Sequence, residues 1–383
     1  MDIYLDNAAT TFPKPPCVVK AVTDCMENYA VNAGRGVYPL GHKADEVIFE
    51  TRKKVASLLT YPKGQVIFSY SATFAINQVL LGINWKANDV IYTTPFEHNS
   101  VARVLYHLEN VFGVKVIIIP VNSKTFEYDI DALRQKFMQI PPTAVVMTHV
   151  SNVFGLITPV ISIAEMAKAY SSIIVVDGAQ GGPLLPLEDT RGLIDFYIFS
   201  GHKTFYGPFG IAGFVITGNV PLKPIIFGGT GSHSELMSMP TDLPFGQESG
   251  SPNIVAIAGL NAACDWLCET GTNYIREHEK SLLRYVVEGL ADFSDDVRLY
   301  VHNDLNNHLG TLSFTIDGYK AQEIGMILSQ EYHISTRTGL HCAPQAHKFL
   351  GTVPHGTIRV GFGFFNNKDD CNQLIDAIKS IVD

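Results

Sequence analysis

The stretch IIVVDGAQ, residues 173–180, determines the fold class. Four consecutive β-branched residues are typical of a strand that helices cover on both faces, because a half-exposed strand would alternate apolar and polar side chains. The run ends in Asp177, and ligands of open α/β sheets bind beyond the carboxyl ends of the strands. Asp177 is therefore a candidate site residue, with the cap of a following helix as an equally good alternative.

Similar apolar runs alternate with helical stretches such as 44–59 along residues 15–260. The runs are 65–68, 90–92, 116–119 and 144–148. This alternation predicts an α/β fold with a mostly parallel, doubly wound sheet. A long helical pattern over 273–293 and two later strands predict a smaller α+β unit. We expect a large domain at 15–261 and a small domain that combines 1–14 with 262–383.

Composition excludes several classes of protein. The 383 residues are 46% apolar and only 17% charged, which favours two packed domains and an oligomer. The net charge of -9 is spread out, so we expect no nucleic-acid partner. No apolar run of membrane-spanning length and no signal peptide is evident, so we expect a cytoplasmic protein with no membrane partner. Six irregularly spaced cysteines predict free thiols.

Lys203 is a candidate for covalent chemistry. It closes the segment Ser200-Gly201-His202-Lys203 after the apolar run 196–199, so it should lie at a strand end in a cleft. Desolvation there lowers the pKa of a lysine enough for a Schiff base. Taken alone, the segment is better explained by a surface lysine. Asp177 adds weight, because a carboxylate ending a buried strand needs a partner such as a protonated pyridine nitrogen.

Ser71, Ala72 and Thr73 follow a predicted strand and begin a helix. Hydroxyl and backbone N–H groups at a helix N-terminus form a phosphate site, although an ordinary N-cap is the commoner explanation. The glycines near residue 207 lack the G-x-G-x-x-G spacing. A Walker A loop, HExxH and GxSxG are also missing, which argues against nucleotide and serine-hydrolase chemistry.

Two groups of residues resemble metal ligands only superficially. Cys264 and Cys268 are one helical turn apart, and we expect a core pair. Another group surrounds Cys342 and comprises His341, His347 and His355, but it lacks the spacing of a zinc finger or ribbon. We therefore expect no metal.

Segments spread over nearly the whole chain resemble the class V aminotransferase superfamily of fold-type I pyridoxal-phosphate enzymes, specifically the cysteine desulfurase and selenocysteine lyase family. They are LDNAATT at 5–11, EHNS at 97–100, SNV at 151–153, SGHK at 200–203 and RTGLHCAP at 337–344. The short spacing around Cys342 resembles the group II branch, which includes the Suf-type desulfurases.

The resemblance implies a mostly parallel seven-stranded sheet, bound pyridoxal 5'-phosphate and a homodimer. It implies that Lys203 holds the cofactor covalently, Asp177 pairs with the pyridine nitrogen and His98 stacks on the ring. Asn152 and Gln180 would hold the phenolic oxygen. The remaining cofactor contacts would be made at the phosphate by Ser71, Ala72, Thr73, Ser200, His202 and, across the dimer interface, Ser251.

For the substrate, the resemblance implies that Arg359 binds the carboxylate, with Asn152 nearby and Arg35 at the border of the partner's site. A solvated strand arginine is the alternative for Arg359. Cys342 lies between Gly339 and Pro344, which predicts a loop.

By the same resemblance, Cys342 takes sulfur from L-cysteine as a persulfide, L-alanine is released, and a sulfur-acceptor protein serving iron–sulfur cluster assembly receives the sulfur. One alternative is a selenocysteine lyase that acts on L-selenocysteine with less dependence on Cys342. An aminotransferase or epimerase would not need Cys342 at all. A non-catalytic scaffold is disfavoured, because Lys203, Asp177, Cys342 and Arg359 are all present.

Overall fold

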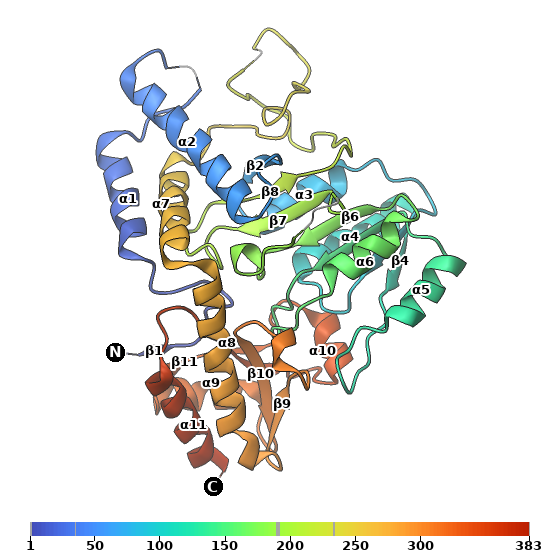
Figure 1. The fold of residues 1–383 in the computed structure, drawn as a ribbon, viewed down its shortest axis with the longest axis vertical. Helices are drawn as coiled ribbons and strands as arrows, with labels where there is room; N and C mark the ends of the chain where they lie inside the picture. Colours follow the sequence, from blue (N-terminus) through green and yellow to red (C-terminus); the bar gives the residue numbers. More distant parts are fainter. Residues whose placement is uncertain (1, 35, 189–191, 233, 383) are drawn as a thin grey trace.

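The computed structural model describes residues 2–34, 36–188, 192–232 and 234–382. Its centre is a seven-stranded sheet (Figure 1). In spatial order the strands are β2 (Gln65–Ser69), β8 (Ala212–Ile216), β7 (Phe196–Ser200), β6 (Ile173–Asp177), β5 (Ala144–Thr148), β3 (Val90–Thr93) and β4 (Lys115–Ile118). β7, β6, β5, β3 and β4 pair in parallel, whereas β8 pairs antiparallel to both β2 and β7. The predicted mostly parallel α/β fold is confirmed.

Helices cover both faces of this sheet. On one face, α2 (Pro39–Leu58), α5 (Ile130–Gln139), α6 (Val160–Lys168) and α7 (Ile254–Thr270) contribute to a core that includes Ile174 and Val176. On the other face, α3 (Ala72–Gly82) and α4 (Asn99–Phe112) pack around Val175. Adjacent residues of β6 thus enter opposite cores, which explains why the strand is apolar throughout.

A second sheet is antiparallel and has the spatial order β12 (Arg337–Gly339), β13 (Thr357–Gly361), β10 (Thr311–Ile316) and β9 (Val297–Tyr300). It packs with α8 (Thr272–Gly289), α9 (Ala321–Gln330) and α11 (Lys368–Val382) into a separate core. The N-terminal strand β1 (Ile3–Tyr4) pairs in parallel with β11 (Ile334–Ser335), so Ile3 and Leu5 join this core.

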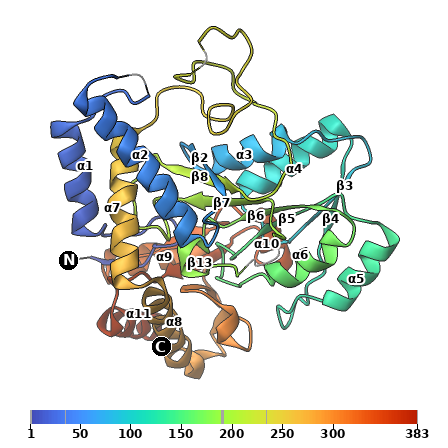
Figure 2. The ribbon, with the colours of Figure 1, turned by 45° about the horizontal axis from the view of Figure 1, so that its top comes forward.

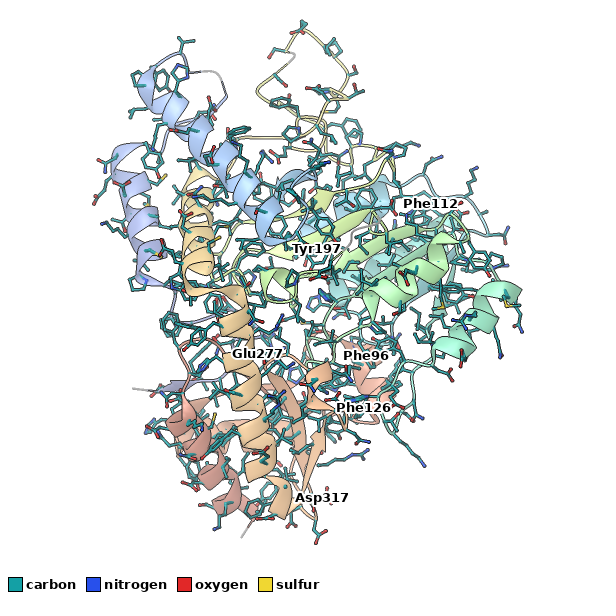
Figure 3. The ribbon with its side chains drawn as sticks, in the orientation of Figure 1. Phe96, Phe112, Phe126, Tyr197, Glu277 and Asp317 are labelled. Atoms are coloured by element: carbon teal, nitrogen blue, oxygen red, sulfur yellow. The ribbon has the colours of Figure 1, made fainter. Side chains whose placement is uncertain are left out.

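Two segments link the sheets. α7 packs on α1 (Pro16–Asn28) and α2, and α8 continues from it to the second sheet after a break at Gly271, where φ is +88°. An aromatic cluster containing Phe96 and Phe126, both labelled in Figure 3, packs against Ala346 and Leu350 of α10 (Pro344–Leu350). The segment before α10 is therefore fixed between the two sheets.

The described residues between β8 and α7 form neither helix nor strand, and Figure 2 shows them as a long loop beyond the end of α2. Among the described helices, none combines the length and apolarity that crossing a membrane requires.

Candidate active site

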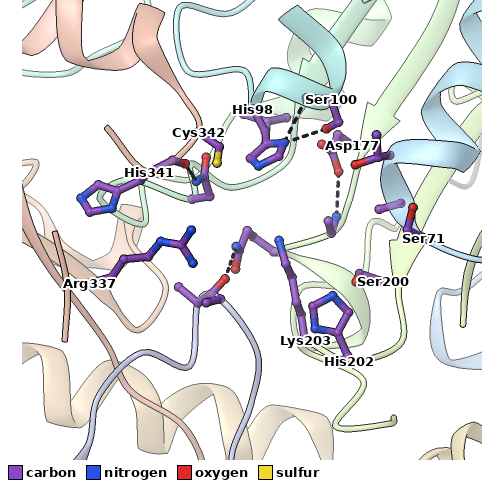
Figure 4. Close-up of a pocket in the computed structure, with 18 of the residues that line it drawn as sticks. Ser71, His98, Ser100, Asp177, Ser200, His202, Lys203, Arg337, His341 and Cys342 are labelled. Carbon is purple, nitrogen blue, oxygen red and sulfur yellow. Dashed lines mark hydrogen bonds between the residues drawn. The ribbon is translucent and has the colours of Figure 1, made fainter. Parts of the chain in front are cut away.

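A cavity of about 220 Å³ opens where the carboxyl ends of β5, β6 and β7 face the second sheet. Figure 4 shows side chains from both sheets around it. Its lining is Ala8, Ala9, Ser71, Ala72, Thr73, His98, Ser100, Thr148, Asn152, Asp177, Ala179, Gln180, Ser200, His202, Lys203, Arg337, His341, Cys342 and Arg359. Every predicted site residue is among them except Ser251, which is exposed on the long loop, and Arg35, which lies outside the described residues.

Lys203 follows β7 and extends into this cavity. Desolvation of its amino group lowers the pKa to about 8, and the Arg359 and Arg337 cations act in the same direction, whereas Asp177 opposes them. About a tenth of this lysine is therefore an uncharged amine at pH 7, which is the form that attacks a carbonyl carbon.

Asp177 ends β6 and is 5% exposed. Its carboxylate accepts the N–H of Ala179 at 3.0 Å. Burial raises its pKa, while this hydrogen bond and the Lys203 cation lower it. No α-helix follows directly, because a turn and a short 3-10 helix at Gly182–Leu184 come next. The alternative of a helix cap is therefore wrong.

His98 is the N-cap of α4 and faces the same space as Lys203 (Figure 4). Its Nδ1 accepts the backbone N–H of Ser100 at 3.1 Å, so the neutral ring has its proton on Nε2. Burial and nearby cations, Lys203 and Arg337 foremost, lower its pKa to about 4. The imidazole is therefore uncharged at neutral pH and can stack on a flat aromatic ligand.

The end of the cavity near α3 fits an anion. Ser71 is the N-cap of α3 and accepts the N–H of Phe74 at 3.2 Å, so backbone donors of the first helical turn lie beside it. The ring of His202 stacks on that of Phe209 with centroids 4.5 Å apart, and its Nδ1 is buried with no hydrogen-bond partner among the residues described. This orphaned nitrogen and the helix N-terminus are complementary to a phosphate group.

The second sheet contributes two arginines. Arg359 on β13 is 2% exposed and pairs with Asp6 at 2.6 Å, while it donates to the carbonyl of Asn152 at 2.9 Å. Its Nε is buried, and no described residue forms a hydrogen bond with it. Arg337 on β12 is directly opposite Arg359 in the sheet register. Both line the cavity, which gives this wall a positive charge suited to a carboxylate. The solvated-arginine alternative for Arg359 is wrong.

Cys342 lies in a loop between β12 and α10, as predicted, and its side chain is exposed. Its carbonyl accepts the N–H of Asn99 at 2.6 Å, which attaches the loop to the start of α4. Cys342 also borders a second, more open hollow of about 410 Å³ beside Arg103 and Tyr106. The thiol is thus accessible both from the inner cavity and from outside.

Sequence reasoning placed Arg337 beside Cys342 in the chain, but it predicted neither Arg337 nor Asp6 as a neighbour of Arg359. Their partners are distant in the chain, and only the sheet register and the Arg359 ion pair reveal them. The expected core pair of cysteines is also wrong, because Cys264 is buried but Cys268 is exposed. Among the residues that the structure describes, no three His, Cys, Asp or Glu side chains are grouped as metal ligands.

Known proteins resemble this chain in both sequence and structure. The aminotransferase class-V family matches residues 3–374. A probable cysteine desulfurase of Pyrococcus abyssi is 31% identical over 387 residues, covering 99% of this chain and 94% of the relative. The apo structure of a cysteine desulfurase from Thermococcus onnurineus NA1 has a TM-score of 0.92 at 29% identity, covering 100% and 94%. A cysteine desulfurase from Escherichia coli, solved with an S-sulfonic acid, has a TM-score of 0.88 at 28% identity, covering 99% and 94%.

Proposed function

The chain belongs to the class V aminotransferase family, and we propose that it is a pyridoxal-phosphate-dependent cysteine desulfurase that converts L-cysteine to L-alanine. One observation supports this most strongly: a single cavity contains the desolvated Lys203, the buried Asp177 and the exposed Cys342. The first two suit amino-acid chemistry on a pyridine cofactor, and the third suits sulfur acceptance.

The residues present fit pyridoxal 5'-phosphate. Asp177 would pair with the ring nitrogen, neutral His98 would stack on the ring, and Lys203 would bind the aldehyde carbon. Asn152 and Gln180 would hold the phenolic oxygen. The phosphate would be bound by Ser71, Ala72, Thr73, Ser200 and His202. When bound, the cofactor supplies an electron sink for charge that develops at the substrate Cα.

The protein's own groups then act on the substrate. Arg359 binds the carboxylate, because its guanidinium faces the cavity and Asp6 and Asn152 fix its orientation. Lys203, with its pKa lowered to about 8, takes the proton from Cα and returns one later. The thiolate of Cys342 attacks the substrate sulfur, and the bond from that sulfur to Cβ breaks with its electron pair left on the carbon side. The sulfur stays on Cys342 as a persulfide, and protonation of Cβ gives alanine.

The open hollow beside Cys342 supports onward transfer, because an acceptor thiol from another protein can approach the persulfide there without entering the cavity. We also assign Ser251 to the phosphate of a partner protomer in a homodimer, with Arg35 at the same border. The two separate cores support a division into a large domain at 15–261 and a small domain formed by 1–14 and 262–383.

The test compares native protein with Cys342→Ala. Each is incubated with pyridoxal phosphate, a reductant and either L-cysteine or L-selenocysteine, and alanine is measured. We expect native turnover of cysteine and loss of it in the variant, whose yellow cofactor absorbance persists. If both proteins turned over L-selenocysteine at equal rates and neither turned over L-cysteine, the result would indicate a selenocysteine lyase. No alanine from either substrate would contradict the proposed function and favour an aminotransferase.

A further inference from the structure

The turn that presents Cys342 is held in an unusual backbone conformation. His341 has φ +46° and Cys342 has φ +57°, so two consecutive non-glycine residues occupy the left-handed region. Such residues persist there only where their surroundings enforce the geometry. Asn152 donates to the carbonyl of His341 at 2.7 Å, and Asn99 donates to that of Cys342. The N–H of Ala343 donates to the carbonyl of Leu340 at 2.8 Å, and the His341 side chain is a further restraint.

The hydrogen bonds of His341 determine its tautomer. Nε2 lies 3.1 Å from the carbonyl of Thr357 and 3.0 Å from its Oγ1. The hydroxyl of Thr357 donates to Ser313 at 3.0 Å, and the hydroxyl of Ser313 donates to the carbonyl of Val153 at 2.6 Å. Both Thr357 oxygens are thus acceptors toward His341, so Nε2 has the proton. Nδ1 then presents a buried lone pair, and it has no hydrogen-bond partner among the described residues.

His347 on α10 has an unpaired ring nitrogen of the opposite kind, an N–H donor without an acceptor among the described residues. Its side chain is fully buried, and its Nδ1 lies 2.8 Å from the hydroxyl of Thr352. That hydroxyl is 3.4 Å from the carbonyl of His347, so we assign its proton to the shorter contact with Nδ1. Nε2 of His347 then has a proton. Like Nδ1 of His341, it is buried and has no hydrogen-bond partner in the part of the chain that the structure describes. The two ring centroids are 5.3 Å apart.

Neither ring is protonated near neutral pH. Burial lowers the pKa of His347 to about 4. It also lowers the pKa of His341 well below its usual value, and Arg359, His347 and Arg337 act in the same direction. Both imidazoles are therefore neutral near pH 7, with one free donor and one free acceptor on adjacent rings.

We propose that His347 is a positioning residue for Cys342: its Nε2–H pairs with Nδ1 of His341 and thereby holds the left-handed turn that aims the thiol into the cavity. The ring centroids are 5.3 Å apart, and the pairing requires the rings to turn so that these two nitrogens face each other. The pairing completes a chain of hydrogen bonds from Thr352 on one side of the turn to β13 and β10 on the other. The turn is then fixed by α10 as well as by the second sheet.

The kinetic test rests on the proposed desulfurase function. His347→Phe keeps an aromatic ring but removes the donor, and His347→Gln keeps an N–H. We expect His347→Phe to lower kcat for alanine formation about tenfold with KM within twofold, because Arg359 and the cofactor site are untouched while Cys342 loses its alignment. We expect His347→Gln to recover most of the loss. A native kcat in His347→Phe, or an equal loss in both variants, would overturn the proposal.

Leu350→Ala is the matched control. It truncates a buried side chain of α10 without removing any of these hydrogen bonds, so we expect a lower melting temperature but a kcat within twofold of native. If His347→Phe does not fold, Thr352→Val replaces it. That variant removes the partner of His347 Nδ1 and should lower kcat severalfold, and an unchanged kcat would count against the proposal.

A spectroscopic readout separates this proposal from the function itself. In protein labelled with 15N-histidine, His341 Nδ1 should resonate as an unprotonated nitrogen and His347 Nε2 as a protonated one. A proton on His341 Nδ1 would refute the pairing. This measurement needs no substrate, so it tests the pairing independently of catalysis. A native protein that makes no alanine would contradict only the proposed function.

Discussion

At the scale of single residues, the geometry of Arg359 makes it sensitive to a conservative replacement. Its guanidinium already donates to Asp6 and Asn152 while its Nε is unpartnered. A lysine has the charge but not the planar fork that binds a carboxylate with two parallel bonds. We expect Arg359→Lys to raise KM for L-cysteine about 10–100-fold, since a charged hydrogen bond contributes roughly 1.5–3 kcal/mol. Steady-state kinetics measure this.

Arg103→Lys is the control for Arg359→Lys. Arg103 is exposed at the outer hollow and does not line the inner cavity, so we expect KM to remain within twofold of native. An unchanged KM in Arg359→Lys would instead exclude Arg359 as the principal carboxylate ligand.

The lowered pKa of Lys203 predicts that the rate of covalent cofactor binding depends on pH. Its pKa is lowered from 10.5 to about 8, so the fraction of reactive uncharged amine increases as pH rises through 8 and is small well below that pH. Apo protein should therefore bind pyridoxal phosphate covalently about tenfold faster at pH 8 than at pH 6.5, as followed by absorbance in a stopped-flow instrument. Asp177→Asn removes the charge that opposes this lowering of the pKa, so in this variant the binding rate should increase at a lower pH than in native protein. A rate independent of pH would contradict the assignment.

At the scale of elements, the N-terminal segment fixes the loop that contains Lys203. The carbonyl of His202 accepts from Thr10 Oγ1 at 2.9 Å, from the N–H of Thr11 at 3.1 Å and from Lys14 Nζ at 2.9 Å. Burial lowers the pKa of Lys14 to about 8, and no carboxylate pairs with it among the described residues. Its two short contacts, at 2.9 Å each, are to Thr11 Oγ1 and to this carbonyl next to Lys203.

We expect Lys14→Met to loosen that peptide and weaken cofactor retention about tenfold, as measured by absorbance after dialysis. Lys20→Met is the matched control, because Lys20 is exposed on α1, and it should retain the cofactor as native protein does. Equal retention by all three proteins would show that the N-terminal segment does not position Lys203.

Apolar patterning predicted the elements well because burial on two faces leaves a clear signal. The run at 173–176 lies within β6, and the run at 116–119 is displaced by one residue from β4. The predicted helix 273–293 ends earlier, at Gly289, and a separate 3-10 turn follows. The sequence did not predict how β12 and β13 align, because register depends on contacts between distant segments. For the same reason, the arginine pair and the left-handed turn at Cys342 were not foreseen.

At the scale of the whole molecule, large apolar side chains are exposed at the end formed by α1, α2 and the long loop. Figure 1 shows these three segments together, far from α5. The exposed side chains are Met26, Val37, Tyr38, Leu40, Phe227, Leu236 and Met237. Such a concentration marks a surface that another molecule covers. A second copy of this chain fits the assignment of Ser251 to a partner's phosphate site, because Ser251 ends the same loop.

We therefore expect a homodimer of twice 42.0 kDa in sedimentation equilibrium. Phe227→Asp buries an unpaired charge in the proposed interface, so it should weaken dimerisation at least about 100-fold and reduce cofactor retention with it, because each phosphate site loses the partner's Ser251. Met138→Asp alters an equally exposed apolar residue on α5 and should leave the dimer intact. A monomeric native protein that retains its cofactor would show instead that each site is complete within one chain.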